Sequence, residues 1–173
     1  MAKIKTNIKE KKVNLEADHI AVARAQNLPI SLKKSVEICD FLRYKELKKA
    51  QRILNDVMNK KIAIPFKRYN MDTGHKPGMA AGRYPGKASF EILKLLNSAE
   101  ANAENKGLDT EKLVISKLIA NKGNKMFHPG RHRGIKMKRT HIEIILEESQ
   151  INKELNKKWL RNNLFQGRWK NLK

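Results

Sequence analysis

The sequence predicts an α+β fold in which three amphipathic helices accompany a few strands and a long basic hairpin. Apolar residues recur at helical spacing in three separate stretches, alternate with polar residues over 140–147, and flank a basic segment at 120–139 that joins two strand-like arms. A chain of 173 residues is long enough for one globular domain with its own core. We expect this domain at 20–148, between a basic N-terminal extension, 1–19, and a basic C-terminal tail, 149–173.

The first part of the domain predicts one strand and two helices. Residues 19–25 alternate in polarity, which favours a short strand with Ile20 and Val22 on one face. Two apolar stripes follow, over 32–44 and 47–58, and their i, i+3, i+4, i+7 spacing is typical of amphipathic helices. A tight turn or a kink is expected between them.

Residues 60–89 break this pattern. Gly and Pro recur through the stretch, so it predicts a loop, and Asp72 is the one acid among its many Lys and Arg residues. Glycine lets a backbone approach a phosphate closely, and the cations neutralise it. A third helix then begins near Pro85 and ends at Gly107, because Pro suits a first helical turn and Gly suits a C-terminal stop.

The arms of the hairpin follow at 113–119 and 140–147, and we place the whole hairpin at about 112–147. Its linking segment is rich in Lys and Arg and holds no Asp or Glu. Extended arms of roughly ten residues, at about 3.3 Å each, project the tip on the order of 30 Å. An isolated two-stranded ribbon is marginally stable in water, so we expect a polyanion to hold the hairpin in place. In the free protein we expect the tip, 125–139, to be mobile.

The composition of the whole chain indicates the same partner. Lys and Arg total 38 against 17 Asp and Glu, which gives a formal net charge of +21. Self-repulsion on this scale favours a counter-charged partner, nucleic acid first and an anionic membrane surface second. Aromatic residues make up 6%, which does not favour a base-stacking platform. The single cysteine excludes an internal disulfide framework and no apolar run approaches the ~20 residues that span a bilayer, so we expect a soluble, intracellular protein.

The candidate catalytic and metal-binding residues have ordinary explanations. His128 and His132 are spaced i, i+4, but a Pro-Gly pair separates them and no Cys or carboxylate is near, so we predict neither a metal site nor a cofactor. Cys39 lies on an apolar helical face, which favours a buried, inert thiol. Glu100 and Glu104 fit the solvated face of a helix better than a catalytic pair. We therefore predict no enzymatic activity.

Two other functions stay open at this point. A nucleic-acid-modifying enzyme could hold its substrate with basic loops, but it needs convergent titratable residues that the sequence does not offer. A sequence-specific DNA-binding protein could read bases from the second helix through Gln51, Arg52 and Asn55, but this leaves the hairpin unexplained.

Five blocks of sequence resemble one known family, in collinear order over about residues 20–148. The family is the large-subunit ribosomal protein numbered twenty-two in the bacterial series and seventeen in the eukaryotic one. Two of the blocks, IPFKRYN and AGRYP, resemble its archaeal and eukaryotic-cytosolic branch, and are more similar to the archaeal than to the eukaryotic proteins. The blocks are NLPIS at 27–31, IPFKRYN at 64–70, AGRYP at 81–85, NSAEANAENKGLD at 97–109 and HIEIILEE at 141–148.

The resemblance implies a three-stranded antiparallel sheet packed on three helices, with a long protruding β-hairpin that reaches through ribosomal RNA to the wall of the nascent-peptide exit tunnel. It implies a structural role in subunit assembly, no enzymatic activity and a place in the cytoplasmic ribosome. The implied partners are large-subunit ribosomal RNA, neighbouring large-subunit proteins and the nascent peptide, with no membrane. The implied tunnel-facing tip is Met126, Phe127, His128, Pro129, Gly130 and Arg131.

The candidate RNA-binding residues lie in the 60–89 loop, the hairpin and the tail, where cations gather beside Gly, Pro and aromatic residues. In the loop they are Lys60, Lys61, Lys67, Arg68, Tyr69, His75, Lys76, Arg83, Tyr84 and Lys87. In the hairpin they are Lys122, Lys125, Arg131, His132, Arg133, Lys136, Lys138 and Arg139. In the tail they are Lys157, Lys158, Arg161 and Arg168.

The tail is expected to be a second RNA anchor on its composition alone. Its apolar residues recur at near-helical spacing between the cations: Trp159, Leu160, Leu164 and Phe165. Such a segment can dock its apolar face on a neighbouring protein or on its own body while the cations meet phosphate. A solubilising disordered tail and a helix on a membrane surface are the alternatives.

Overall fold

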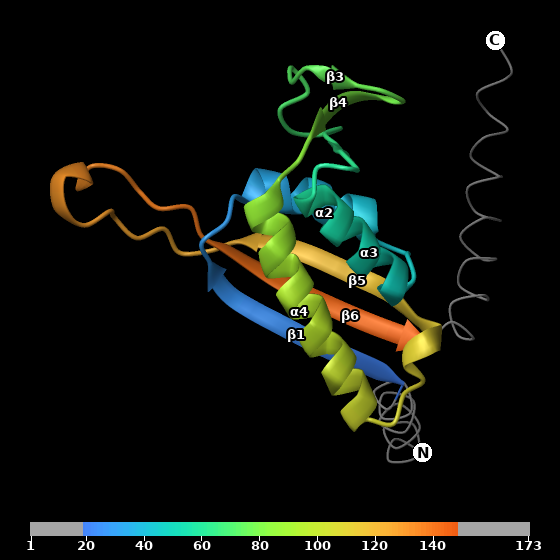
Figure 1. Ribbon diagram of the computed structural model, residues 1–173. Coiled ribbons are helices and arrows are strands. Elements are labelled where there is room, and N and C mark those ends of the chain that lie inside the picture. The colour runs from blue at the N-terminus through green and yellow to red at the C-terminus, as the bar shows by residue number, and fades with distance from the viewer. Residues whose placement is uncertain (1–18, 149–173) are drawn as a thin grey trace, which may run out of the picture.

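The computed structural model describes residues 19–148, which form an antiparallel sheet with three helices on one face (Figure 1). The strand order is β1-β6-β5, with β6 in the middle. β1 and β6 bury alternate residues on the helix-covered face, and β5 buries Leu113, Ile115 and Leu118, with a register shift after Ile115. The core therefore lies between the sheet and the helices. The predicted α+β class is confirmed. The strands are β1 (Ile20–Leu28), β5 (Leu113–Lys122) and β6 (Thr140–Glu148), and the helices are α2 (Leu32–Leu42), α3 (Leu47–Met58) and α4 (Gly86–Asn105).

The central strand β6 shows the predicted alternation. Ile142, Ile144 and Leu146 are at most 1% exposed and point toward the helices, while the residues between them are half-buried on the outer face. In register, Ile144 lies opposite Ala23 of β1 and Leu118 of β5. The inward side chains of all three strands therefore meet in one core.

On β1 the inward face holds small residues. Ile20 and Val22 share a face as predicted, but it is the outer face of the sheet, and Val22 is 36% exposed. The inward residues are Ala21 and Ala23, because α4 passes close over this strand: the side chain of Asn102 donates a hydrogen bond to the Val22 carbonyl oxygen at 3.1 Å. Only small side chains fit beneath a helix at such a close approach.

The predicted stripes of α3 and α4 are buried, but the burial of α2 differs in part. Of the stripe predicted for α2, Cys39 and Leu42 are buried while Leu32 and Val36 are half-buried, and Ile38, which the stripe did not include, is also buried. Tyr44, with φ 64°, lies in the tight turn to α3, and Gly107, with φ 73°, ends α4 as predicted. Among residues 19–148, no helix combines the length and apolar character needed to cross a membrane.

Residues 60–85 form a small lobe with its own short sheet, so the prediction of a loop without strands is wrong, and residues 86–89 already belong to α4. The strand order in the lobe is β2-β4-β3, and the lobe projects from the body beside the N-terminus of α4 (Figure 1). Its strands have two to five residues, too few for an alternation to be visible among the Gly and Pro residues. The strands are β2 (Ile64–Pro65), β3 (His75–Lys76) and β4 (Met79–Arg83).

The hairpin extends away from the body as a long arm (Figure 1). Continuous pairing ends at Lys122 and Thr140, so the strands do not run to the tip as the extended-arm prediction requires. Farther out, an isolated bridge joins Phe127 to Lys136, and every residue from 124 to 136 is exposed. No packed core therefore supports this segment. Two short 3₁₀ turns complete the described chain, η1 (Thr110–Lys112) and η2 (Gly130–His132).

Cys39 provides a probe of the core. It is 1% exposed, and burial raises the pKa of its thiol to about 12, with a smaller contribution from the Asp40 carboxylate. Because the thiolate is the reactive form, we expect a disulfide-exchange dye at pH 8 to leave the folded protein unmodified and to react fully after denaturation. Reaction of the native protein at the rate of a free thiol would contradict this burial.

Candidate nucleic-acid interface

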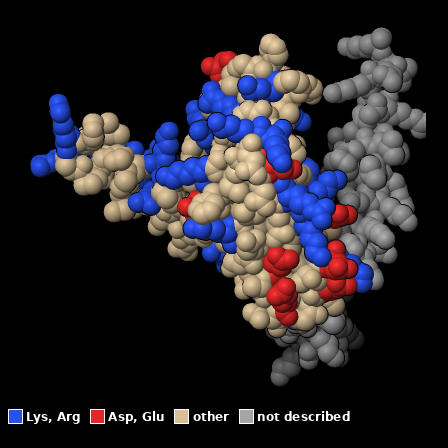
Figure 2. Space-filling view, viewed as in Figure 1, with Lys and Arg blue, Asp and Glu red and all other residues tan. Residues whose placement is uncertain are grey.

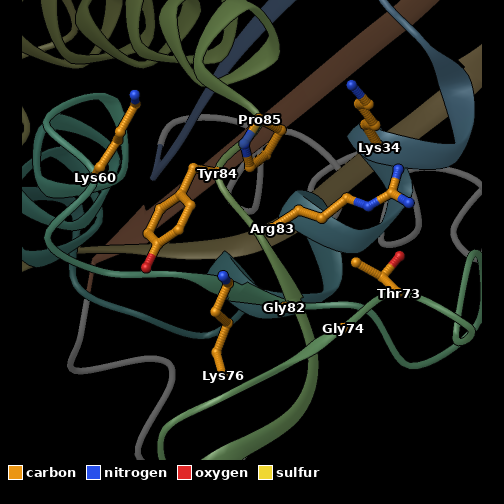
Figure 3. A pocket seen from close by; sticks show the side chains of 9 residues that line it. All are labelled: Lys34, Lys60, Thr73, Gly74, Lys76, Gly82, Arg83, Tyr84 and Pro85. Atoms are coloured by element: carbon orange, nitrogen blue, oxygen red, sulfur yellow. The ribbon is translucent and has the colours of Figure 1, made fainter.

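Two basic clefts lie where the body, the lobe and the base of the hairpin meet. The first, the lobe cleft, has a volume of about 430 Å³ and lies between the lobe, the start of α2 and the end of α3 (Figure 3). Arg83 extends toward Lys34, whereas the next residue, Tyr84, extends to the opposite side (Figure 3). Lys60 and Lys76 lie on the Tyr84 side, and the Lys76 Nζ is 5.7 Å from the centre of the Tyr84 ring. The lobe cleft thus combines cations with an aromatic face.

The second, the hairpin-base cleft, has a volume of about 540 Å³ and is more strongly charged. Of its ten lining residues, seven are Lys or Arg and none is Asp or Glu. The cations come from α2, from β4 and from both arms of the hairpin, so the fold alone brings them together. Lys34 and Arg83 line both clefts, which makes the basic surface continuous. The seven cations are Lys33, Lys34, Arg83, Lys122, Lys125, Lys138 and Arg139.

Lys33 and Lys34 were missing from the sequence-based candidates. They lie in the first turn of α2, which contains no acidic residue. A helix N-terminus carries partial positive charge, so adjacent cations are unfavourable there unless an anion offsets them. Two lysines in the first turn of a predicted helix could therefore have indicated an anion-binding site from the sequence, because residues that conflict with local preferences concentrate at functional sites.

Four cations outside the clefts form ion pairs with acidic side chains within residues 19–148. Figure 2 shows Lys and Arg around the hairpin base and the lobe and again on the right of the body, while the largest acidic group lies at the end of the body farthest from the hairpin. Among residues 19–148, no ion pair includes a cation of either cleft. The positive charges of the clefts are therefore available to bind an external anion. The ion pairs of this part of the chain are Arg24–Glu143, Arg43–Asp40, Lys48–Glu111 and Lys112–Asp109.

The other predicted residues lie around the clefts or at the tip. Lys87 and Lys138 line a smaller hollow beside Tyr84. Tyr69 packs near Lys33, whose Nζ is 5.9 Å from the ring centre. The remaining predicted residues of the lobe region are exposed and line neither cleft: Lys61, Lys67, Arg68 and His75. The same holds for the tip residues Arg131, His132, Arg133 and Lys136. The predicted tail residues, Lys157, Lys158, Arg161 and Arg168, lie outside the described residues.

The geometry also bears on the two alternative functions. Neither cleft is lined by a carboxylate or a thiol that could serve as a catalytic group. On α3, the side chain of Gln51 donates hydrogen bonds to Asn97 at 3.2 Å and to Glu100 at 2.7 Å, both on α4. A side chain held in this way is not available to read a base edge.

Comparison with known proteins gives a consistent match. The family model described as Ribosomal protein L22p/L17e matches residues 23–147. The large ribosomal subunit protein uL22 of Methanosphaera stadtmanae is 44% identical over 140 residues, which cover 76% of this chain and 91% of that protein. The protein of the same name from Archaeoglobus fulgidus is 48% identical over 106 residues, 60% of this chain and 68% of that one. The one from Nanoarchaeum equitans is 39% identical over 145 residues, 79% of this chain and 83% of that one.

Proposed function

The chain belongs to the ribosomal protein L22p/L17e family, in its archaeal branch, and from this membership we propose that its two clefts bind large-subunit ribosomal RNA. It is a structural, non-enzymatic constituent of the large ribosomal subunit. The observation that supports RNA binding most directly is the hairpin-base cleft, with seven cations and no carboxylate in its lining. Phosphodiester groups are the anions that suit such a continuous surface, because each neutralised phosphate releases counterions and adds to the affinity.

The two clefts are suited to different parts of the RNA. All charged residues that line the hairpin-base cleft are cations and none of its lining residues is aromatic, so it is suited to phosphates of the RNA backbone. In the lobe cleft, Tyr84 is 37% exposed and can stack on an unpaired base while Lys60 and Lys76 contact the adjoining phosphates. Exposed polar residues around the clefts extend this surface: Lys61, Lys67, Arg68, His75 and Lys87.

Binding to a large-subunit ribosomal RNA fragment at increasing salt tests the proposal. We expect the logarithm of the association constant to fall linearly with the logarithm of the salt concentration, with a slope of about −0.7 to −0.9 per phosphate contact. The full chain should also sediment with large subunits at low salt and be released at high salt. A slope near zero would exclude phosphate contacts as the source of affinity.

We further propose that the hairpin tip forms part of the wall of the nascent-peptide exit tunnel. The tip projects far from the body (Figure 1), and the side chains of Met126 and Phe127 are each 58% exposed. Exposed apolar groups at the end of an unsupported arm favour a partner that covers them. A stalled nascent chain with a photo-crosslinker should therefore label residues 126–131, and labelling confined to other proteins would contradict the proposal.

Deleting residues 125–136 and bridging the arms with two glycines should leave the body folded. The deleted segment is exposed throughout, whereas the core lies between the sheet and the helices. We expect thermal unfolding to stay cooperative with nearly the same midpoint. The salt slope of RNA binding should fall by about one for each removed cation that contacts a phosphate, namely Lys125 of the hairpin-base cleft and the predicted tip cations Arg131, Arg133 and Lys136. Calorimetry and salt titrations measure the two effects. Loss of cooperative unfolding would show that the hairpin is part of the core.

We also propose that the tail, 149–173, is a second RNA anchor. It holds seven Lys and Arg residues against Glu154, together with both tryptophans of the chain. Truncation after Glu148 should lower the affinity for the large subunit and reduce the salt slope by about one for each phosphate that the tail would have neutralised. Identical affinity and slope for the full-length and truncated proteins would show that the tail does not bind RNA.

A further inference from the structure

Glu37 is a buried carboxylate whose hydrogen bonds hold a basic turn in place. The residue lies on the buried face of α2 and is 3% exposed. It accepts hydrogen bonds from the consecutive backbone N–H groups of Lys67, Arg68 and Tyr69, at 3.0, 3.0 and 2.7 Å. Because no ion pair among residues 19–148 includes Glu37, these amides are the groups that offset its charge.

The three amides form an anion-binding nest. Successive backbone N–H groups that converge in a turn bind anions, and phosphate is a common ligand of such nests. In this protein an internal side chain occupies the nest, and a buried carboxylate is tolerated because donors surround it. The contact joins residues 30 to 32 positions apart in the sequence. The conformation of the turn is therefore tied to α2 and not to its local sequence alone.

This turn lies at the edge of the hairpin-base cleft. The Arg68 guanidinium is 5.4 Å and the Lys33 Nζ is 5.9 Å from the centre of the Tyr69 ring. The next residue, Asn70, has φ 54° and lines the cleft itself. Helix α2 thus shapes the interface twice: the lysines of its first turn line the cleft, and Glu37 holds the turn against the helix.

We propose that Glu37 is a positioning residue for RNA binding, an inference that rests on the proposed function. By ordering the turn at 67–70 before RNA arrives, it lets Lys67 and Arg68 meet phosphates without a further loss of conformational entropy. Ordering one or two residues on binding lowers an affinity by about tenfold or more. Glu37 therefore raises the affinity without contacting the RNA.

Glu37→Gln tests this role, because glutamine keeps the size of the side chain but turns an amide NH₂ toward one of the three N–H donors. We expect the amides of 67–69 to lose hydrogen-exchange protection and the affinity for the ribosomal RNA fragment to fall about tenfold. The salt slope should fall by up to about two as Lys67 and Arg68 cease to neutralise phosphates. In a K67Q/R68Q background, the same substitution should change the affinity by less than about twofold, since the residues through which Glu37 acts are gone.

Leu54→Ala is the matched control, because it truncates a buried side chain on α3 that lines neither cleft. It should lower stability and leave the salt slope unchanged. An equal loss of affinity for Glu37→Gln in both backgrounds would overturn the inference. If Glu37→Gln does not fold, hydrogen exchange of the wild-type protein is measured instead. Slow exchange of the backbone amides of 67–69 supports the role of Glu37, and rapid exchange of these amides overturns it.

A K34Q/R83Q/K138Q variant separates this inference from the proposed function. If RNA binding does not respond to the loss of these cleft cations, the proposed function is overturned. If it responds to them but not to Glu37→Gln, the role of Glu37 alone is overturned.

Discussion

Replacing Lys34, Arg83 and Lys138 together with glutamine is expected to weaken binding to large-subunit ribosomal RNA by about two to three orders of magnitude near 0.1 M salt. Lys34 and Arg83 line both clefts, and Lys138 lines the hairpin-base cleft and the adjoining hollow. If each contacts one phosphate, the slope of the logarithm of affinity against the logarithm of salt falls by about three. Fluorescence anisotropy over a range of salt concentrations measures both quantities.

The matched control replaces Lys48, Lys49 and Arg52 with glutamine. These residues are exposed on α3 and line neither cleft, and the variant has the same formal net charge as the cleft variant. Charges more than about a Debye length from the RNA are screened, so we expect the affinity to change by less than about threefold. Equal losses of RNA affinity in the two variants would show that the affinity depends on the net charge of the protein and not on the positions of the cations in the clefts.

The Ile144→Ala variant is expected to lose about 2–5 kcal/mol of the free energy of unfolding. Ile144 is 0% exposed in the middle of the central strand, between Ala23 of β1 and Leu118 of β5. Alanine leaves a cavity that close-packed neighbours fill only in part. Each kcal/mol lowers the midpoint of thermal unfolding by about 2–4 °C for a chain of this size, so calorimetry should show a fall of roughly 5–15 °C.

Ile145→Ala is the control on the same strand. Ile145 is the next residue, points to the outer face of the sheet and is half-buried. Because no helix of residues 19–148 covers this face of the sheet, we expect a loss of roughly 1 kcal/mol. Similar losses for the two variants would contradict a core confined to one face of the sheet.

Elements with a regular buried face were predictable from the sequence. The alternation of Ile142, Ile144 and Leu146 and the apolar stripes of α3 and α4 depend on burial of one face, which the spacing of residues records directly. The long acid-free stretch at 113–141 likewise predicted a protruding basic hairpin. The resemblance to the ribosomal family predicted the three-stranded antiparallel sheet on three helices.

Features that depend on distant neighbours were decided by the tertiary structure. The close passage of α4 over β1 placed Ala21 and Ala23 in the core, although more apolar residues lie beside them in the sequence. Pairing with β4 placed β2 and β3 in a sheet, within a stretch whose composition alone predicts a loop. Lys34 and Lys138 are far apart in the chain and meet in one cleft because α2 packs beside the base of the hairpin. Electrostatic contact depends on distance in space, and no periodicity along a chain records which of its cations will come together.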